Sequence, residues 1–208
     1  MASVEQYPIL EVPGISGLRI PLSKSANTHD HSLGTEIPDW VVSFRDDSDE
    51  ALKTESTLSG TQMDGVPLTK CVRLCGFLYD CSHNILESPE TVYYPSGTMW
   101  ASTIHLVLQN GKHKVYITKA VSDGLITPII TIARLVRVGE EMVGKNQTID
   151  FKYCHWNYIT SANDFIVAGF TAIKRTNTVY QRKQTTGVVT GQTCTITNYG
   201  KNTVNAGE

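Results

Sequence analysis

The sequence lacks the features of a membrane-spanning or nucleic-acid-binding protein. Its 208 residues hold 18 Lys and Arg against 20 Asp and Glu, a formal net charge of −2, so no excess of positive charge attracts nucleic acid or an anionic membrane. No stretch approaches the roughly 18 uninterrupted apolar residues of a membrane span, and the N-terminus has no signal-peptide pattern. We therefore expect a soluble protein, made in the cytoplasm without a cleaved signal.

Motifs of common enzymes are also missing. The chain has no G-x-S-x-G, phosphate-binding loop or dinucleotide-binding fingerprint. Cys154 and His155 are adjacent on a predicted strand, so their side chains point to opposite faces and cannot form a nucleophile and base. We therefore expect no catalytic residue and no enzymatic activity.

Cysteine is too scarce and too irregularly spaced for a disulfide framework or a familiar zinc site. Five cysteines, an odd number without a signal peptide, indicate reduced thiols. Cys71, Cys75, Cys81 and His83 could bind zinc chemically, but their C-x3-C-x5-C-x-H spacing is not a recognised zinc knuckle. Because their neighbours are apolar, we expect these thiols to pack in the core.

A second metal candidate lies nearer the N-terminus. His29, His31 and Glu36 have the local spacing of ligands on a β-barrel strand and resemble the first ligand motif of the cupins. No matching second motif with a further histidine follows. A solvated polar loop is the simpler interpretation, so we expect no metal and no cofactor.

What the sequence does contain is β-structure, centred on residues 146–175 (NQTIDFKYCHWNYITSANDFIVAGFTAIKR). Thr148 to Thr160 and Phe165 to Lys174 are rich in strand-forming residues, and the Ser, Asn and Asp between them favour a tight reversal. Alternation along the first arm predicts one face with Ile149, Phe151, Tyr153, His155 and Ile159, and the other with Asp150, Lys152, Cys154, Trp156 and Tyr158. Neither face is wholly polar, so we expect a sheet covered on both sides, as in a closed barrel.

Other segments extend this all-β pattern. Asn110-Gly111 predicts a hairpin turn, because both central residues of a type I′ turn need positive φ. Gly76 to Asn84 is the best candidate for one short helix, and the prolines of residues 87–100 indicate an irregular excursion. Further strands are expected at residues 7–20, 40–44, 66–74, 103–109, 113–121, 125–138 and 186–197. About ten strands and one helix predict a sandwich or a barrel.

The chain also carries, in order, ILEVPGISG, PDWVVSF, a long polar loop, VPLTK, FLYDCSHN, HKVYITKAV, LITPI, NQTIDFKY and IVAGFTAIKR. This order, over about residues 7–176, resembles the haemolysin-coregulated proteins (Hcp), the tube subunits of type VI secretion systems. The resemblance implies a small, mainly antiparallel β-barrel with one short flanking α-helix over residues 1–176. Within it lie a long loop at 45–65 and an insertion at 87–99. Residues 177–208 would be a C-terminal extension with one further strand and a flexible tail.

The resemblance also implies a structural function without bond chemistry. Such a subunit forms homohexameric rings that stack into a tube inside a contractile sheath, together with a spike. The tube is expelled from the bacterial cytoplasm with effector proteins, and its subunits are secreted without a cleaved signal peptide.

Charge is uneven along the chain although its total is near zero. Residues 30–55 include eight acidic and two basic residues, and residues 165–208 include five basic and one acidic. In a head-to-tail ring or a stack, an acidic and a basic surface would meet at each contact, although two solvated surfaces are an equally good interpretation. The candidate interface residues are Arg45, Asp46, Asp47, Asp49, Glu50, Lys174, Arg175, Arg182 and Lys183.

Two other classes of function remain open at this point. A cupin-like, metal-dependent jelly-roll enzyme would use His29, His31 and Glu36. A monomeric β-sandwich that binds carbohydrate would use exposed aromatic residues, of which Tyr93, Tyr94 and Trp100 are candidates.

Overall fold

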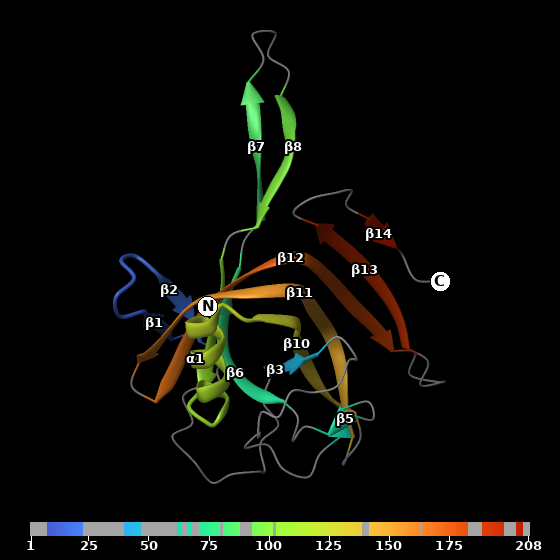
Figure 1. Cartoon of the computed structure of the whole chain (residues 1–208). Helices are drawn as coiled ribbons and strands as arrows, with labels where there is room; N and C mark the ends of the chain where they lie inside the picture. The colour runs from blue at the N-terminus through green and yellow to red at the C-terminus, as the bar shows by residue number, and fades with distance from the viewer. Residues whose placement is uncertain are drawn as a thin grey trace, which may run out of the picture.

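The structure, a computed structural model, is built mainly of antiparallel strands (Figure 1). It describes residues 8–22, 40–46, 62–63, 66–67, 71–79, 81–87, 93–101, 103–138, 142–162, 164–182, 189–197 and 203–205. The strands are β1 (Ile9–Glu11), β2 (Arg19–Pro21), β3 (Trp40–Arg45), β4 (Gln62–Met63), β5 (Val66–Pro67), β6 (Val72–Leu78), β7 (Cys81–Glu87), β8 (Tyr93–Ala101), β9 (Ile104–Gln109), β10 (Ile126–Val138), β11 (Met142–Ala162), β12 (Phe165–Arg182), β13 (Val189–Thr197) and β14 (Thr203–Asn205). The helix, α1, is His113–Asp123.

Six of these strands close into a barrel. Around the barrel the order is β12, β9, β6, β3, β10 and β11, and β11 pairs with β12 to complete the circle. Each of these neighbouring pairs is antiparallel. β13 and β14 continue the sheet beyond β12, and β4 and β5 continue it beyond β11. The predicted fold class, a mainly antiparallel β-barrel with one short helix, is confirmed.

Aliphatic and aromatic side chains from all six strands fill the barrel. Trp156, Phe44 and Phe151 are the largest of the fully buried residues. The Phe170 ring centroid lies 5.3 Å from the centroids of both Phe151 and Trp156. The indole Nε1 of Trp156 donates a hydrogen bond to Thr127 Oγ1 at 2.8 Å, which satisfies the one polar group that this ring brings into the core.

The helix lies where a hairpin arm was expected. The predicted strand at residues 113–121 is wrong, because β9 ends at Gln109 and the chain continues from the Asn110-Gly111 pair into α1. Ile117 and Ala120, three residues apart, are fully buried in the barrel core. Packing at this helical period outweighs the β-branched composition of the segment.

The helix predicted at residues 76–84 is wrong for a related reason. Its first residues belong to β6, which pairs with both β3 and β9 inside the barrel, and its last residues begin β7. Long-range strand pairing therefore outweighs the local spacing of Phe77, Leu78 and Cys81. The expected irregular excursion at residues 87–100 is also partly wrong, since β8 pairs with β7 there.

The hairpin centred on residues 146–175 is confirmed. β11 and β12 are antiparallel partners from Gln147↔Val179 to Ala162↔Phe165. A strand is also present in the predicted segment 186–197, where β13 pairs with the far end of β12.

The N-terminal hairpin covers one patch of the outer barrel surface. β1 and β2 form a two-stranded sheet of their own, and Leu22 next to it bridges to Gly76 of β6. Val12, Ile20 and Leu22 pack there on outward-facing Val107 and Val167. No helix in the described ranges is long and apolar enough to cross a membrane.

Candidate functional site

Many of the sequence-predicted site residues lie outside the described residues. The three metal candidates His29, His31 and Glu36 do so, as do Asp47, Asp49, Glu50 and Lys183 of the predicted interface. Arg182 is described only as the last residue of β12, and Tyr93, Tyr94 and Trp100 only as backbone positions of β8. Arg45, Asp46, Lys174 and Arg175 can be placed.

The thiols that the structure places are buried, and their pKa values are raised. Cys71, Cys75 and Cys154 are free and buried, and desolvation raises the pKa of Cys71 and of Cys75 to about 11. Cys154 lies inside the barrel whereas His155 is exposed on the outside, as strand alternation requires. Among residues with placed side chains, no cluster of three or more His, Cys, Asp and Glu could hold a metal ion.

Arg45 has a structural contact inside the sheet. Its Nη2 donates hydrogen bonds to Thr131 Oγ1 and, at 3.3 Å, to Asp150 Oδ1. The Thr131 hydroxyl donates to the same Asp150 oxygen at 2.5 Å. Thr131 of β10 is paired with Asp150 of β11, whereas Arg45 of β3 is paired with Ile129, two residues before Thr131. The Arg45 side chain is only 24% exposed. Arg45 therefore fastens three barrel strands together.

Arg175 is likewise engaged within its own chain. Its guanidinium carbon lies 4.8 Å from the ring centroid of Tyr79, a cation–π distance. Tyr79 in turn stacks on Phe77 with centroids 5.9 Å apart and meets Phe151 edge-on at 6.2 Å. Arg175 therefore adds to the packing of an aromatic cluster as well as to the positive charge of β12.

Two lysines stand opposite each other on the outside of the barrel. Lys152 of β11 pairs with Lys174 of β12 in the strand register, and Lys152 is exposed. Directly opposed like charges destabilise a sheet, so this pair would gain from an acidic partner. Lys152 was not among the predicted interface residues, because only the register shows that it faces Lys174.

The predicted alternation along the first arm is wrong from Tyr153 to Trp156, and a bulge between Trp156 and Tyr158 restores it, so that Ile159 packs on the barrel core as predicted. Ile149 and Phe151 point into the barrel, but Cys154 and Trp156, assigned to the other face, point inward as well. The change of face occurs at Tyr153, which adopts a positive φ of 55°, an uncommon conformation for a bulky residue. Tyr153 is consequently turned to the outside and is 52% exposed.

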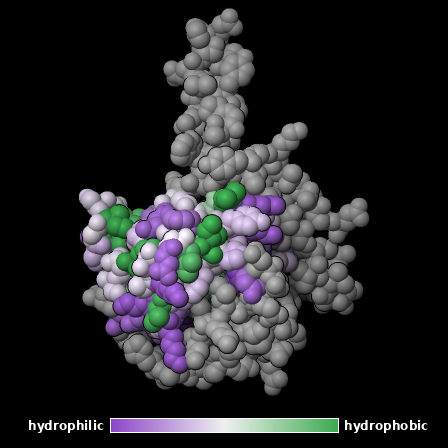
Figure 2. Space-filling view, viewed as in Figure 1, coloured by the Kyte–Doolittle hydropathy of each residue, from purple (hydrophilic) through white to green (hydrophobic). Residues whose placement is uncertain are grey.

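Tyr153 belongs to a group of exposed apolar residues that we call the apolar corner: Ile126, Tyr153 and Ile173. They lie on neighbouring strands β10, β11 and β12, and Ile126 and Ile173 are 57% and 47% exposed. Figure 2 shows that the described part of the viewed face is largely polar, with apolar surface in separate patches. The sequence does not reveal this corner. Strict alternation puts Tyr153 on the same face as Phe151 and gives no sign that the strand changes face there.

A tyrosine and a histidine form a second polar contact on the outer surface. The Tyr158 hydroxyl and His105 Nδ1 are hydrogen-bonded at 2.6 Å, although their strands β11 and β9 are separated by β12. The Tyr158 ring can cross β12 because the residue between them is Gly169. Burial raises the pKa of Tyr158 to about 12, so its hydroxyl stays protonated at neutral pH and ties the strands together.

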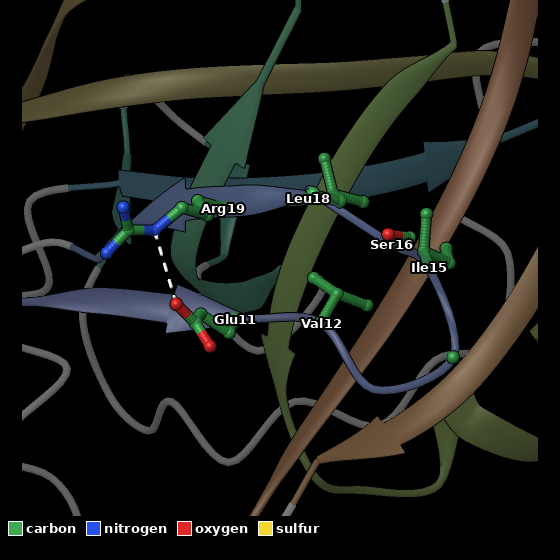
Figure 3. Close-up of a pocket in the computed structure, with 8 residues that line it drawn as sticks. Glu11, Val12, Ile15, Ser16, Leu18 and Arg19 are labelled. Atoms are coloured by element: carbon green, nitrogen blue, oxygen red, sulfur yellow. Dashed lines mark ion pairs between the residues drawn. The ribbon is translucent and has the colours of Figure 1, made fainter.

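The loop of the β1–β2 hairpin encloses an open hollow of about 540 Å³ (Figure 3). Arg19 Nε and Glu11 Oε1 form an ion pair at 3.4 Å beside it, and both side chains are well exposed. Gly14 and Gly17, with φ of 82° and 77°, allow the loop to turn. The hollow has only this solvated pair as charged groups, so its geometry serves the turn better than it would serve catalysis.

The comparisons with known proteins bear on the fold. No family model matches the sequence, and no curated protein does. Among solved structures, one described as a type six secretion system protein aligns with a TM-score of 0.60 and 13% identity, covering 80% of this chain and 100% of that one. The Hcp1 protein of E. coli EAEC 042, in a mutant form, gives 0.54 and 9%, with coverages of 74% and 97%.

Hcp1 of Salmonella typhimurium aligns in the same way, with a TM-score of 0.52 and 6% identity, covering 79% of this chain and 99% of its own. Likeness at such low identity establishes the fold. The order of sequence segments along the chain predicted the fold of the Hcp proteins, and this fold is therefore confirmed.

Proposed function

We propose that this chain is a structural subunit of a type VI secretion tube, assembling as homohexameric rings that stack and are expelled with effector proteins. The observation that carries the proposal is the extent of the structural match. The barrel with its helix aligns with nearly the whole length of Hcp1 and of a type six secretion system protein. Partners would then be other copies of this chain, a contractile sheath, a spike and effectors.

The chemistry of the described surface supports assembly over catalysis. The placed thiols are protonated and buried, and the Tyr158 hydroxyl is held by His105 at the sheet surface. The outside of the barrel instead carries exposed apolar residues and a pair of opposed lysines, which are features of contact surfaces. In the same proposal, the subunit is held in the bacterial cytoplasm before firing and leaves the cell without a cleaved signal.

The predicted acidic and basic surfaces are part of the proposed contact between rings, with Lys152 added to the basic surface. The acidic segment with Asp46, Asp47, Asp49 and Glu50 would meet the basic surface of the next ring, and Lys152 joins Lys174 on that basic surface. Arg45 and Arg175 contribute mainly to their own subunit, through Asp150 and Tyr79. Contacts of this kind set orientation more than affinity and weaken as salt rises.

Size and shape in solution test the proposal. Purified protein should have a mass of about six times the 22.9 kDa chain by multi-angle light scattering, and negative-stain images should show rings with a central opening. Stacks should shorten between low and molar salt while the rings persist. A chain that stays monomeric at high concentration in low salt would overturn the proposal.

A further inference from the structure

Two neighbouring strands each turn two successive residues to the outside of the barrel at the apolar corner. Strand side chains normally alternate, so inward-facing positions lie two residues apart. On β11 the inward-facing residues Phe151 and Cys154 are three apart, and both are buried in the core. Their partners in the strand register of β12, Arg175 and Ala172, are also three apart. The residues between them therefore face outward together: Lys152 and Tyr153 on β11, and Ile173 and Lys174 on β12.

This arrangement costs the single subunit free energy in three ways. Tyr153 adopts a positive φ of 55°, which is strained for a bulky residue and persists only where its surroundings hold it. Tyr153 and Ile173 are both about half exposed, so much of their apolar surface stays in water. Lys152 stands opposite Lys174, and directly opposed like charges destabilise a sheet. Unfavourable features that coincide at one place are typical of a functional surface.

The chemistry of this surface defines the partner that would relieve these costs. The exposed apolar side chains, with Ile126 of β10 among them, would be covered by apolar groups, as at the centre of a protein–protein contact. Lys152 and Lys174 beside them would be neutralised by carboxylates. The preceding carboxylate on β11, Asp150, is already held by Arg45. The complementary surface is therefore apolar, with acidic groups at its edge.

A second copy of this chain supplies such carboxylates. Residues 30–55 include eight acidic and two basic residues, whereas the whole chain has a formal net charge of only −2. In the proposed tube the acidic segment of one ring meets the basic surface of the next ring, and Lys152 and Lys174 belong to that basic surface. Tyr153 and Ile173 adjoin these lysines along the two strands, so they would lie in the same contact.

We infer that the apolar corner is the buried centre of the contact between stacked rings, with Lys152 and Lys174 at its rim. The inference rests on the proposed tube function and adds the apolar groups that hold successive rings together. A charged rim sets orientation and is screened by salt, whereas burial of apolar surface does not depend on such charges. Salt therefore separates the two contributions.

Two variants remove these contributions one at a time. The corner variant carries Tyr153→Asn and Ile173→Thr, because Asn tolerates the left-handed backbone and Thr keeps β-branching. The rim variant carries Lys152→Gln and Lys174→Gln, which keep long polar side chains without their charge. Val115→Gln, which changes an apolar residue 74% exposed on α1, is the matched control. Circular dichroism checks the fold, and Ile173→Thr alone, with a smaller effect on stacking, replaces the double change if that unfolds.

Analytical ultracentrifugation and negative-stain images measure the size of rings and stacks at low and at molar salt. All variants should keep their rings. The unchanged protein and the Val115→Gln control should form long stacks at low salt and short stacks at molar salt. The corner variant should form only short stacks at low salt and none at molar salt, because only its charged rim remains. The rim variant should form short stacks whose length does not change with salt.

Each other outcome overturns the inference. If the corner variant stacks like the unchanged protein at molar salt, the corner faces something other than the next ring. If the folded corner variant forms no rings, the corner lies between subunits of one ring. If the rim variant keeps the full salt dependence, the lysines do not border the contact. If the unchanged protein forms rings that never stack, the contact does not exist, and if it is monomeric, the tube function fails as well.

Discussion

Two apolar patches lie on the outside of the same barrel, and they differ in what covers them. Val167 of β12 is fully buried under the N-terminal hairpin, with Ile20 of β2 as one of its covering residues. Ile173, farther along the same strand, is 47% exposed with Tyr153 beside it. A barrel strand that is apolar on both faces needs a cover on its outer face. Among the residues that the structure describes, the N-terminal hairpin supplies that cover at one patch, and no element covers the other, bare patch.

The largest expected effect is a difference in the free energy of unfolding between a substitution in the covered patch and one in the bare patch. Ile20→Ala removes buried side-chain volume from the covered patch and should lower the free energy of unfolding by about 2–5 kcal/mol. Ile173→Ala on the bare patch should change it by no more than about 0.5 kcal/mol. Urea unfolding followed by tryptophan fluorescence measures both. Equal losses would mean that the apolar corner is covered within the subunit.

The next effect tests the contact that crosses β12 between the two patches. An alanine Cβ at Gly169 would lie 2.2 Å from Cε1 of Tyr158, so the ring would have to move and its hydrogen bond to His105 would break. Gly169→Ala should therefore cost about 1–3 kcal/mol of stability. In a Tyr158→Ala background the same change should cost much less, and strict additivity in this double-mutant cycle would contradict the geometry.

Sequence reasoning succeeds where long-range packing agrees with local pattern. The hairpin of β11 and β12 is evident from two strand-forming segments around a polar turn, and apolar residues on both faces lead correctly to a closed barrel. The order of segments from ILEVPGISG to IVAGFTAIKR also leads correctly to the Hcp fold.

It fails where tertiary contacts decide between two local possibilities. Residues 113–123 contain Val115, Ile117 and Val121, which favour a strand, yet burial of Ile117 and Ala120 makes them a helix. The apolar corner depends on the positive φ of Tyr153, which no residue type nearby signals. The pairing of β7 with β8 escapes prediction because Pro95 and Gly97 resemble loop residues, although a register shift accommodates them.

A smaller effect, on pH dependence, concerns the start of the helix. Burial lowers the pKa of His113 below its ordinary value of 6.5, an effect that a hydrogen bond to the Gln109 backbone partly offsets. The folded state therefore favours the neutral ring. Its contribution to stability is complete above pH 6.5 and is lost as the pH falls through the lower folded-state pKa.

Replacing this ring tests the sign of that dependence. His113→Asn, which keeps a donor without the titrating ring, should reduce the difference in unfolding free energy between pH 7.5 and about pH 5. His155→Asn on the exposed outer face is the matched control and should keep the original difference. A His113→Asn variant whose stability falls as steeply in acid would show that other groups govern the dependence.

The smallest effect concerns the lysines beside the bare patch, where stability and assembly should change in opposite directions. Lys174→Glu turns the Lys152↔Lys174 pair into an opposite-charge pair and should stabilise the single subunit by about 0.2–1 kcal/mol. It also removes a positive charge that the acidic surface of the next ring would use, so assembly should weaken, most visibly at low salt. Lys174→Gln should fall between the two in both measurements. Urea unfolding of the dilute subunit measures the effect on stability, and sedimentation at two salt concentrations measures the effect on assembly. A Lys174→Glu variant that is more stable but assembles unchanged would show that these lysines are not part of the contact surface.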